Sequence, residues 1–168
     1  MITVSRNIGN ISDPVFSGMR TDLLMLEWFE CSKRIFRKRT VSGVELAFRS
    51  LDAASPLSEG DVLHADSECL IVVGIIPCKV LVVQPRSPSE MAAVSYEIGN
   101  KHLPLFYEDG FLLVPFEMPL YKLLLAQGIP VEACEKKLLN RLNTSVAPHG
   151  APGGQSLFSR IMGMKNDG

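Results

Sequence analysis

The chain has 168 residues, of which 46% are hydrophobic and 21% are charged, and its formal net charge is −1. This composition is typical of an ordinary globular protein with one large domain or two small ones. The nearly neutral charge argues against a surface built mainly for nucleic acid or for anionic membranes.

Neither export nor membrane insertion is predicted. Residues 1–6 do not show the basic segment and apolar stretch with which a signal peptide begins. The most apolar stretch, residues 69–83, contains Gly74, Pro77 and Lys79 and is shorter than the roughly 20 residues that a membrane helix needs. The four cysteines form no C-x-x-C pair. We therefore expect a cytoplasmic protein with reduced thiols and no contact with membranes.

The first part of the chain, residues 1–76, is predicted to form a small all-β domain. Five short runs have the composition of strands and are separated by turn residues: 23–30, 32–40, 44–50, 61–64 and 69–75. Strands this close together favour two short packed sheets, as in a small antiparallel sandwich or barrel. The first twenty residues do not distinguish between strand and loop.

The pattern changes at Pro77, where a second domain, residues 77–142, is predicted. A strand at 79–84 precedes the sequence Ser87-Pro88-Ser89-Glu90, which is a capping box that begins a helix, and Gly99-Asn100 marks its last turn or its end. Strands at 105–107 and 111–114 then flank an Asp-Gly hairpin turn. A helix at about 117–127 ends at Gly128 and leads to a strand at 131–138. The order βαββαβ predicts a ferredoxin-like, α+β domain.

Residues 143–168 are rich in glycine and proline and predict a flexible C-terminal tail.

The three histidines, His64, His102 and His149, fit no metalloprotease or catalytic-triad motif. His102 follows the first predicted helix, where a histidine usually complements the helix dipole. One imidazole is too few donors for a metal ion, but a two-fold axis would supply each nearby residue twice. His149 lies in the tail, where the ordinary interpretation is a solvated loop histidine. We assign no function to His64.

A basic run precedes the middle of the first domain: Lys33, Arg34, Arg37, Lys38 and Arg39. It can be a solvated hairpin face, a docking surface for an acidic protein, or a nucleic-acid site. Nucleic acid is the weakest of the three because the overall charge is neutral and stacking aromatics are scarce nearby.

Residues 96–104, which include Gly99-Asn100-Lys101-His102, resemble the signature of the UreE family of urease accessory proteins. The similarity continues through residues 115–119 and the leucine-rich helix to Gly128. It is also visible earlier, in residues 27–30, in Thr40-x-x-Gly43 and in residues 57–63. It covers most of residues 20–140.

The resemblance implies an N-terminal β domain of a type called peptide-binding and a C-terminal metal-binding domain that forms a homodimer. It implies a non-enzymatic nickel metallochaperone that delivers Ni²⁺ for assembly of the urease active site. His102 of both protomers would bind one ion at the dimer interface, and His149 would complete the shell. The implied partners are the GTPase UreG and apo-urease with its other accessory proteins. Residues 150–168 contain no histidine, which argues against high-capacity nickel storage.

Imidazole also suits zinc and copper, so Zn²⁺ and Cu²⁺ are expected to fit the same site. A site with few protein ligands is labile, unlike a structural zinc site closed by four. The alternative function is a non-catalytic protein-interaction or RNA-binding module that uses the basic strand; an enzyme is disfavoured for want of a catalytic motif.

Overall fold

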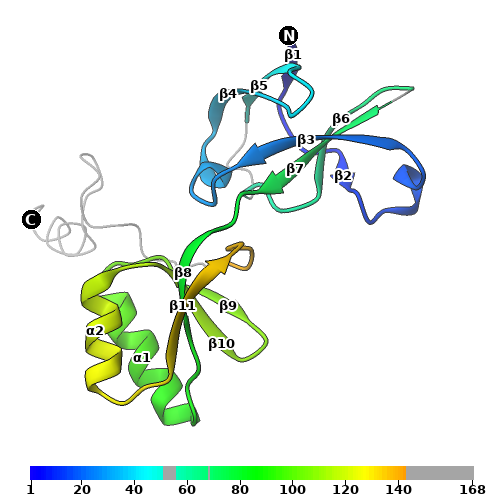
Figure 1. The fold of residues 1–168 in the computed structure, drawn as a ribbon. Helices are drawn as coiled ribbons and strands as arrows, with labels where there is room; N and C mark the ends of the chain where they lie inside the picture. The colour runs from blue at the N-terminus through cyan, green and yellow to red at the C-terminus, as the bar shows by residue number, and fades with distance from the viewer. Residues whose placement is uncertain (51–55, 68, 143–168) are drawn as a thin grey trace, which may run out of the picture.

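The computed structural model describes residues 1–50, 56–67 and 69–142. Figure 1 shows two halves that are joined between strands β7 and β8, with the two α-helices in the second half. The tail predicted to be flexible, together with His149, lies outside the described residues. Within them, no helix has the length and apolar character needed to cross a bilayer.

The N-terminal half contains strands and two short 3₁₀ helices. In chain order they are β1 (Ile2–Val4), β2 (Gly9–Asn10), η1 (Pro14–Phe16), β3 (Arg20–Leu26), η2 (Glu30–Ser32), β4 (Ile35–Arg39), β5 (Glu45–Arg49), β6 (Asp61–Ala65) and β7 (Cys69–Ile75). They form two sheets, one with strand order β1-β5-β4 and one with order β2-β6-β7-β3. The predicted all-β domain of two short sheets is confirmed.

The apolar core of this half lies between the two sheets. It includes Leu24 and Leu26 of β3, Leu46 and Phe48 of β5, and alternate residues of β7. The other alternate residues of β7, such as Leu70 and Val72, form a second cluster with Phe16 and Met19. Because β7 is buried on both faces, its sequence is continuously apolar rather than alternating.

The prediction of an antiparallel arrangement is wrong for two strand pairs. β1 pairs with β5 in parallel, and β3 pairs with β7 in parallel, with Arg20 opposite Cys69. Hairpin turns predict only pairings between neighbouring strands, whereas these pairs join strands far apart in sequence. The run predicted as a strand at 23–30 also ends early, because the chain turns into η2 after Leu26.

The C-terminal half has the predicted ferredoxin-like arrangement. Its elements are β8 (Cys78–Val83), α1 (Pro88–Asn100), β9 (Phe106–Glu108), β10 (Phe111–Pro115), α2 (Met118–Ala126) and β11 (Val131–Lys136). The sheet order is β11-β8-β10-β9, and every pair is antiparallel. The hairpin between β9 and β10 has the two-residue loop Asp109-Gly110 with positive φ at both residues, as an Asp-Gly turn predicts.

The two helices cover one face of this sheet (Figure 1). Val94 and Ile98 of α1 and Leu120 and Leu124 of α2 pack on the strands below and are almost fully buried. The opposite face carries a smaller apolar cluster, and Trp28 from the N-terminal half packs against it. The sheet is therefore buried on both sides, and the N-terminal half contributes to the second.

Candidate metal centre at the end of helix α1

Helix α1 begins at a cap that the sequence predicts. The Ser87 hydroxyl accepts a hydrogen bond from the Glu90 N–H at 3.1 Å, and Pro88 occupies the first helical position. The Glu90 carboxylate, however, accepts from the N–H of Arg86 rather than from that of Ser87, as a capping box requires. Glu90 also pairs with the Arg86 guanidinium at 2.6 Å, which lowers the pKa of that carboxyl. The start of the helix is thereby fixed.

The end of α1 is a Schellman motif with a histidine at its turning point. The His102 N–H donates to the Gly99 carbonyl at 3.0 Å, and the Leu103 N–H donates to the Ile98 carbonyl at 3.3 Å. Leu103 packs against the same apolar cluster as Ile98, which is the hydrophobic contact usual in this motif. His102 has φ 56°, in the left-handed region.

Glycine normally occupies this position because a side chain there is strained by about 1–2 kcal/mol. Within the part of the chain that the structure describes, one other non-glycine residue has positive φ, Asp109, and its hairpin turn explains it. No such local requirement explains the histidine. Strain of this kind, kept at one residue, points to a use for its side chain.

The imidazole of His102 is exposed. The described residues offer it no hydrogen bond or ion pair, while the neighbouring Lys101 pairs with Glu97 at 3.5 Å. Nor do they contain any group of three or more His, Cys, Asp and Glu side chains placed to hold a metal ion. One copy of the described chain therefore supplies a single free imidazole here, and a metal site needs further donors.

The other two histidines stand differently. His64 lies in β6 of the N-terminal half, opposite Ile71 of β7. It is therefore in a different half of the molecule from His102, which follows helix α1. His149 lies outside the described residues.

From residue 92 onward, the outer face of α1 carries one charged side chain, the 37% exposed Glu97 that pairs with Lys101, although a solvated helix normally exposes many charged residues. Its exposed residues from 92 onward are Ala92, Ala93, Tyr96, Gly99 and Asn100. The Tyr96 side chain is 72% exposed, and Leu125 of the adjacent helix α2 is 51% exposed. Apart from its chain neighbours and the backbone of its own helix, no atom of the described residues lies within 4 Å of where a Cβ would stand on Gly99. A surface of small and apolar residues next to His102 is typical of an association surface.

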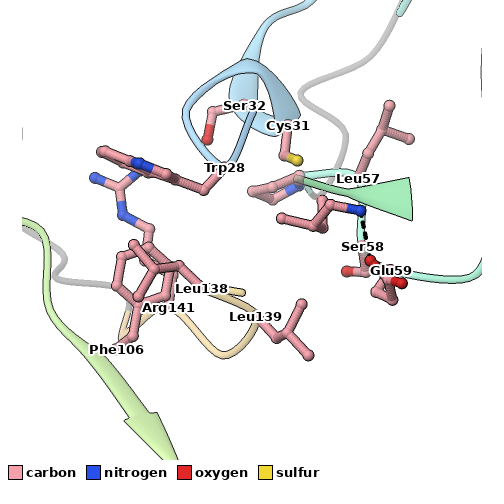
Figure 2. A pocket seen from close by; sticks show the side chains of 12 residues that line it. Trp28, Cys31, Ser32, Leu57, Ser58, Glu59, Phe106, Leu138, Leu139 and Arg141 are labelled. Carbon is pink, nitrogen blue, oxygen red and sulfur yellow. Dashed lines mark hydrogen bonds between the residues drawn. The ribbon is translucent and has the colours of Figure 1, made fainter. Parts of the chain in front are cut away.

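A cleft of about 240 Å³ lies between the two halves of the molecule (Figure 2). The Trp28 ring meets the Phe106 ring edge-on at 5.7 Å, and Leu138 and Arg141 line the same cleft. The cleft also contains Cys31, and burial raises the pKa of its thiol to about 11. The thiol is therefore protonated at neutral pH and is a poor nucleophile. Sequence analysis missed this cleft because its walls come from distant segments; the lone tryptophan after a strand was its one signal.

An all-β half joined to a ferredoxin-like half, with a helix-end imidazole that the described residues leave unpaired, defines a two-domain protein of the α+β class. The N-terminal domain model of the UreE urease accessory protein matches residues 4–75, and the C-terminal domain model matches residues 78–152. The chain belongs to the UreE family of urease accessory proteins. The resemblance in residues 96–104 is confirmed, and so is the expectation of a non-enzyme, because this is a family of accessory chaperones.

Several proteins named urease accessory protein UreE are similar to this chain. That of Flavobacterium johnsoniae is 47% identical over 141 residues, which cover 84% of this chain and 86% of the relative. That of Helicobacter pylori is 36% identical over 153 residues, covering 89% and 90% of the two chains. That of Acetivibrio thermocellus is 35% identical over 126 residues, covering 75% and 82%. The similarity thus extends over both domains.

Proposed function

We propose that the protein is a nickel metallochaperone that delivers Ni²⁺ for assembly of the urease active site. In this proposal it is a cytoplasmic homodimer that associates through the C-terminal domain, and His102 of both protomers binds one Ni²⁺ at the interface. His149 adds a ligand from the tail. The partners are the GTPase UreG and apo-urease with its other accessory proteins.

The observation that carries the proposal is the backbone of His102. The chain holds an exposed imidazole in a conformation that favours glycine, and the described residues leave that imidazole without a partner. The Schellman hydrogen bonds fix the backbone of His102 without occupying the nitrogens of its ring. Such an imidazole is oriented outward and free to bind a ligand that comes from outside the chain.

Association of two copies is supported by the outer face of α1. Its small residues let a second backbone approach closely, and a two-fold axis near the helix end would place the two imidazoles together. Helix glycine costs about 0.5–1 kcal/mol relative to alanine, and nothing in the described chain requires it at position 99. Contact with a partner is a physical reason for its presence.

A site made of two or three imidazoles suits a carrier rather than a permanent holder. Open coordination positions let an acceptor protein add its ligands before the donor releases the ion. The same donors fit Zn²⁺ and Cu²⁺, and copper binds imidazole more tightly than nickel does. Selectivity for nickel therefore has to come from geometry, metal supply or docking to the partner.

Titration calorimetry of the full-length apo protein with NiCl₂ tests the proposal. The wild-type protein should bind one Ni²⁺ per dimer, and His102→Ala should lose most of this binding while its circular dichroism and its mass by light scattering stay those of the wild type. His149→Ala should weaken binding less. His64→Ala is the matched control and should bind as the wild type does. Unchanged stoichiometry and affinity in His102→Ala would show that the site is elsewhere.

A further inference from the structure

Strand β4 places its cations on two opposite faces. On the inner face, the Lys38 ammonium donates to the Met25 carbonyl at 3.0 Å and pairs with the Glu30 carboxylate. Beside it, Phe36 stacks on Phe48, with ring centroids 5.1 Å apart and an interplanar angle of 19°. The inner face therefore contributes to the core, and its lysine is already neutralised.

The outer face of β4 and β5 has a different character. Ile35, Arg37 and Arg39 alternate along the exposed side of β4, and the register places Arg49 opposite Ile35, Ala47 opposite Arg37 and Glu45 opposite Arg39. We call the surface formed by these six residues the arginine face. Arg39 is paired with Glu45 at 2.6 Å. Within the described residues, no carboxylate lies in ion-pair range of Arg37 or Arg49.

Positive charge is concentrated in this segment. Residues 33–49 contain six of the chain's 17 lysines and arginines and one acidic residue, Glu45, although the whole chain carries a formal charge of −1. Repulsion between the guanidinium groups opposes such a concentration. Within the described residues, Glu30 and Glu45 pair with Lys33, Lys38 and Arg39, but no carboxylate pairs with Arg37 or Arg49. The charge that compensates these two arginines is therefore expected from another molecule.

We propose that the arginine face is a docking surface for an extended acidic segment of a partner protein. Arg37 and Arg49 are diagonal neighbours on the same face, about 7–8 Å apart in such a sheet. Alternate side chains of an extended segment point the same way at a spacing of about 7 Å. Two carboxylates at alternate positions can therefore each pair with one guanidinium, which binds carboxylate in a bidentate manner.

The composition of the face favours protein over nucleic acid. Ile35 lies next to the two free arginines and is 68% exposed, so it offers an apolar contact for a partner side chain. The aromatic residues of the hairpin, Phe36 and Phe48, point to the core and offer no surface on which bases could stack. The single-stranded nucleic-acid interpretation lacks the stacking surface that it requires.

The arginine face is independent of the proposed nickel site. Strands β1, β5 and β4 lie at the end of the N-terminal half that is away from α1 and α2 (Figure 1). A partner bound there leaves the end of α1 accessible. The inference thus goes beyond nickel delivery, and either can hold if the other fails.

The test measures binding of a short fluorescein-labelled peptide, with glutamate at alternate positions and one leucine, to the full-length protein by fluorescence anisotropy at low salt. Arg37→Gln/Arg49→Gln should raise the Kd at least about fivefold, the loss expected from two exposed charged pairs. The control Arg6→Gln/Lys122→Gln removes two other exposed cations, so it has the same net charge, and should change the Kd less than about twofold. Arg37→Lys/Arg49→Lys keeps the charge but loses the bidentate geometry, so its Kd should lie between those of the wild type and of the glutamine variant.

Absence of peptide binding to the wild-type protein, or equal losses in the two glutamine variants, would overturn the proposal. So would tighter binding of a single-stranded RNA of equal charge that is lost in the same variants, because the face would then be a nucleic-acid site. Thermal unfolding of each variant verifies that it is folded. The nickel titration of Arg37→Gln/Arg49→Gln should match that of the wild type, which separates this inference from the proposed function.

Discussion

Glu59 and Lys137 lie 78 positions apart in the sequence, and their side chains form an ion pair at 2.6 Å that links the two halves of the molecule. Glu59 also accepts a hydrogen bond from the Ile75 N–H, close to the connection between β7 and β8. Nearby, Trp28 packs against the cores of both halves. An ion pair and a large aromatic side chain are thus among the contacts of the described residues that join the two halves.

We expect Trp28 to contribute more to this junction than the ion pair does. The Glu59 and Lys137 side chains are both more than a third exposed, and a pair so exposed contributes at most about 1 kcal/mol. Lys137→Gln should therefore lower the free energy of unfolding by less than about 1 kcal/mol. Trp28→Ala should lower it by about 2–3 kcal/mol, because truncation removes contacts with both clusters. Urea denaturation followed by circular dichroism measures both values.

Trp28→Phe is the control for the size of the ring. Its free energy of unfolding should lie between those of the wild type and of Trp28→Ala. The opposite ranking, with Lys137→Gln the more damaging variant, would mean that charge rather than packing holds the two halves together.

Local signals in the sequence predict most elements of the fold. The Asp109-Gly110 turn is predictable because a two-residue hairpin loop needs positive φ, which this pair tolerates. The parallel pairing of β3 with β7 is not, because it depends on tertiary contacts between segments far apart in sequence. The contact of Trp28 with Phe106 is unpredictable for the same reason, because the two rings come from different halves of the molecule.

The candidate site is predictable in position but not in geometry. The sequence places His102 just after a helix, and the resemblance indicates its chemistry. The sequence predicts the last turn or the end of the helix at Gly99-Asn100, and α1 does end at Asn100. The left-handed residue that follows the helix, however, is the histidine. A glycine within a helix end normally predicts that it will take the positive φ itself. The sequence alone therefore does not predict which residue at the helix end takes the left-handed conformation.

Gly99 gives two substitutions with opposite expected effects. Gly99→Ala should raise the free energy of unfolding by about 0.5–1 kcal/mol, because alanine is the better helix former and, among the described residues, a Cβ meets no atom within 4 Å outside its own helix and chain neighbours. Gly99→Leu should also fold, since the space is open within the described chain. If α1 forms the proposed dimer interface, the leucine variant should be monomeric by light scattering and bind nickel weakly. A leucine variant that remains a dimer with normal nickel binding would place the interface elsewhere.

His102→Gly should separate stability from metal binding. Glycine adopts φ 56° without strain, so relief of about 1–2 kcal/mol should exceed the entropy that glycine adds to the unfolded chain. We expect the metal-free variant to be more stable by up to about 1 kcal/mol, although its nickel binding is lost. Chemical denaturation in the presence of a chelator, paired with calorimetry, tests both expectations.

His102→Asn serves as the control because asparagine tolerates the left-handed region. It should lose nickel binding at nearly unchanged stability. If the glycine variant were instead less stable than the wild type, the imidazole would have a structural role that the strain argument does not include.

The carboxylate of Glu30 predicts an acid-dependent part of the stability. Burial alone would raise the pKa of Glu30, but hydrogen bonds from the Lys38 ammonium and, at 3.0 Å, from the Glu27 N–H lower it below the ordinary 4.5. A pKa lowered by folding stabilises the protein above the unfolded value, and this contribution is lost as the pH falls through the folded value. Glu30→Gln should therefore lower the free energy of unfolding by about 1–2 kcal/mol at pH 7.

The difference between Glu30→Gln and the wild type should shrink steadily below about pH 4.5, because the wild-type carboxyl then becomes neutral as well. Glu45→Gln is the matched control: it also removes a carboxylate paired with a cation, but Glu45 and Arg39 are both exposed, so solvent and salt screen the pair. Its effect at pH 7 should be the smaller of the two. Urea denaturation of the three proteins at several pH values between 3 and 7 gives the comparison. A Glu30→Gln deficit that stayed constant or grew in acid would assign the loss to packing around Lys38 rather than to the charge on Glu30.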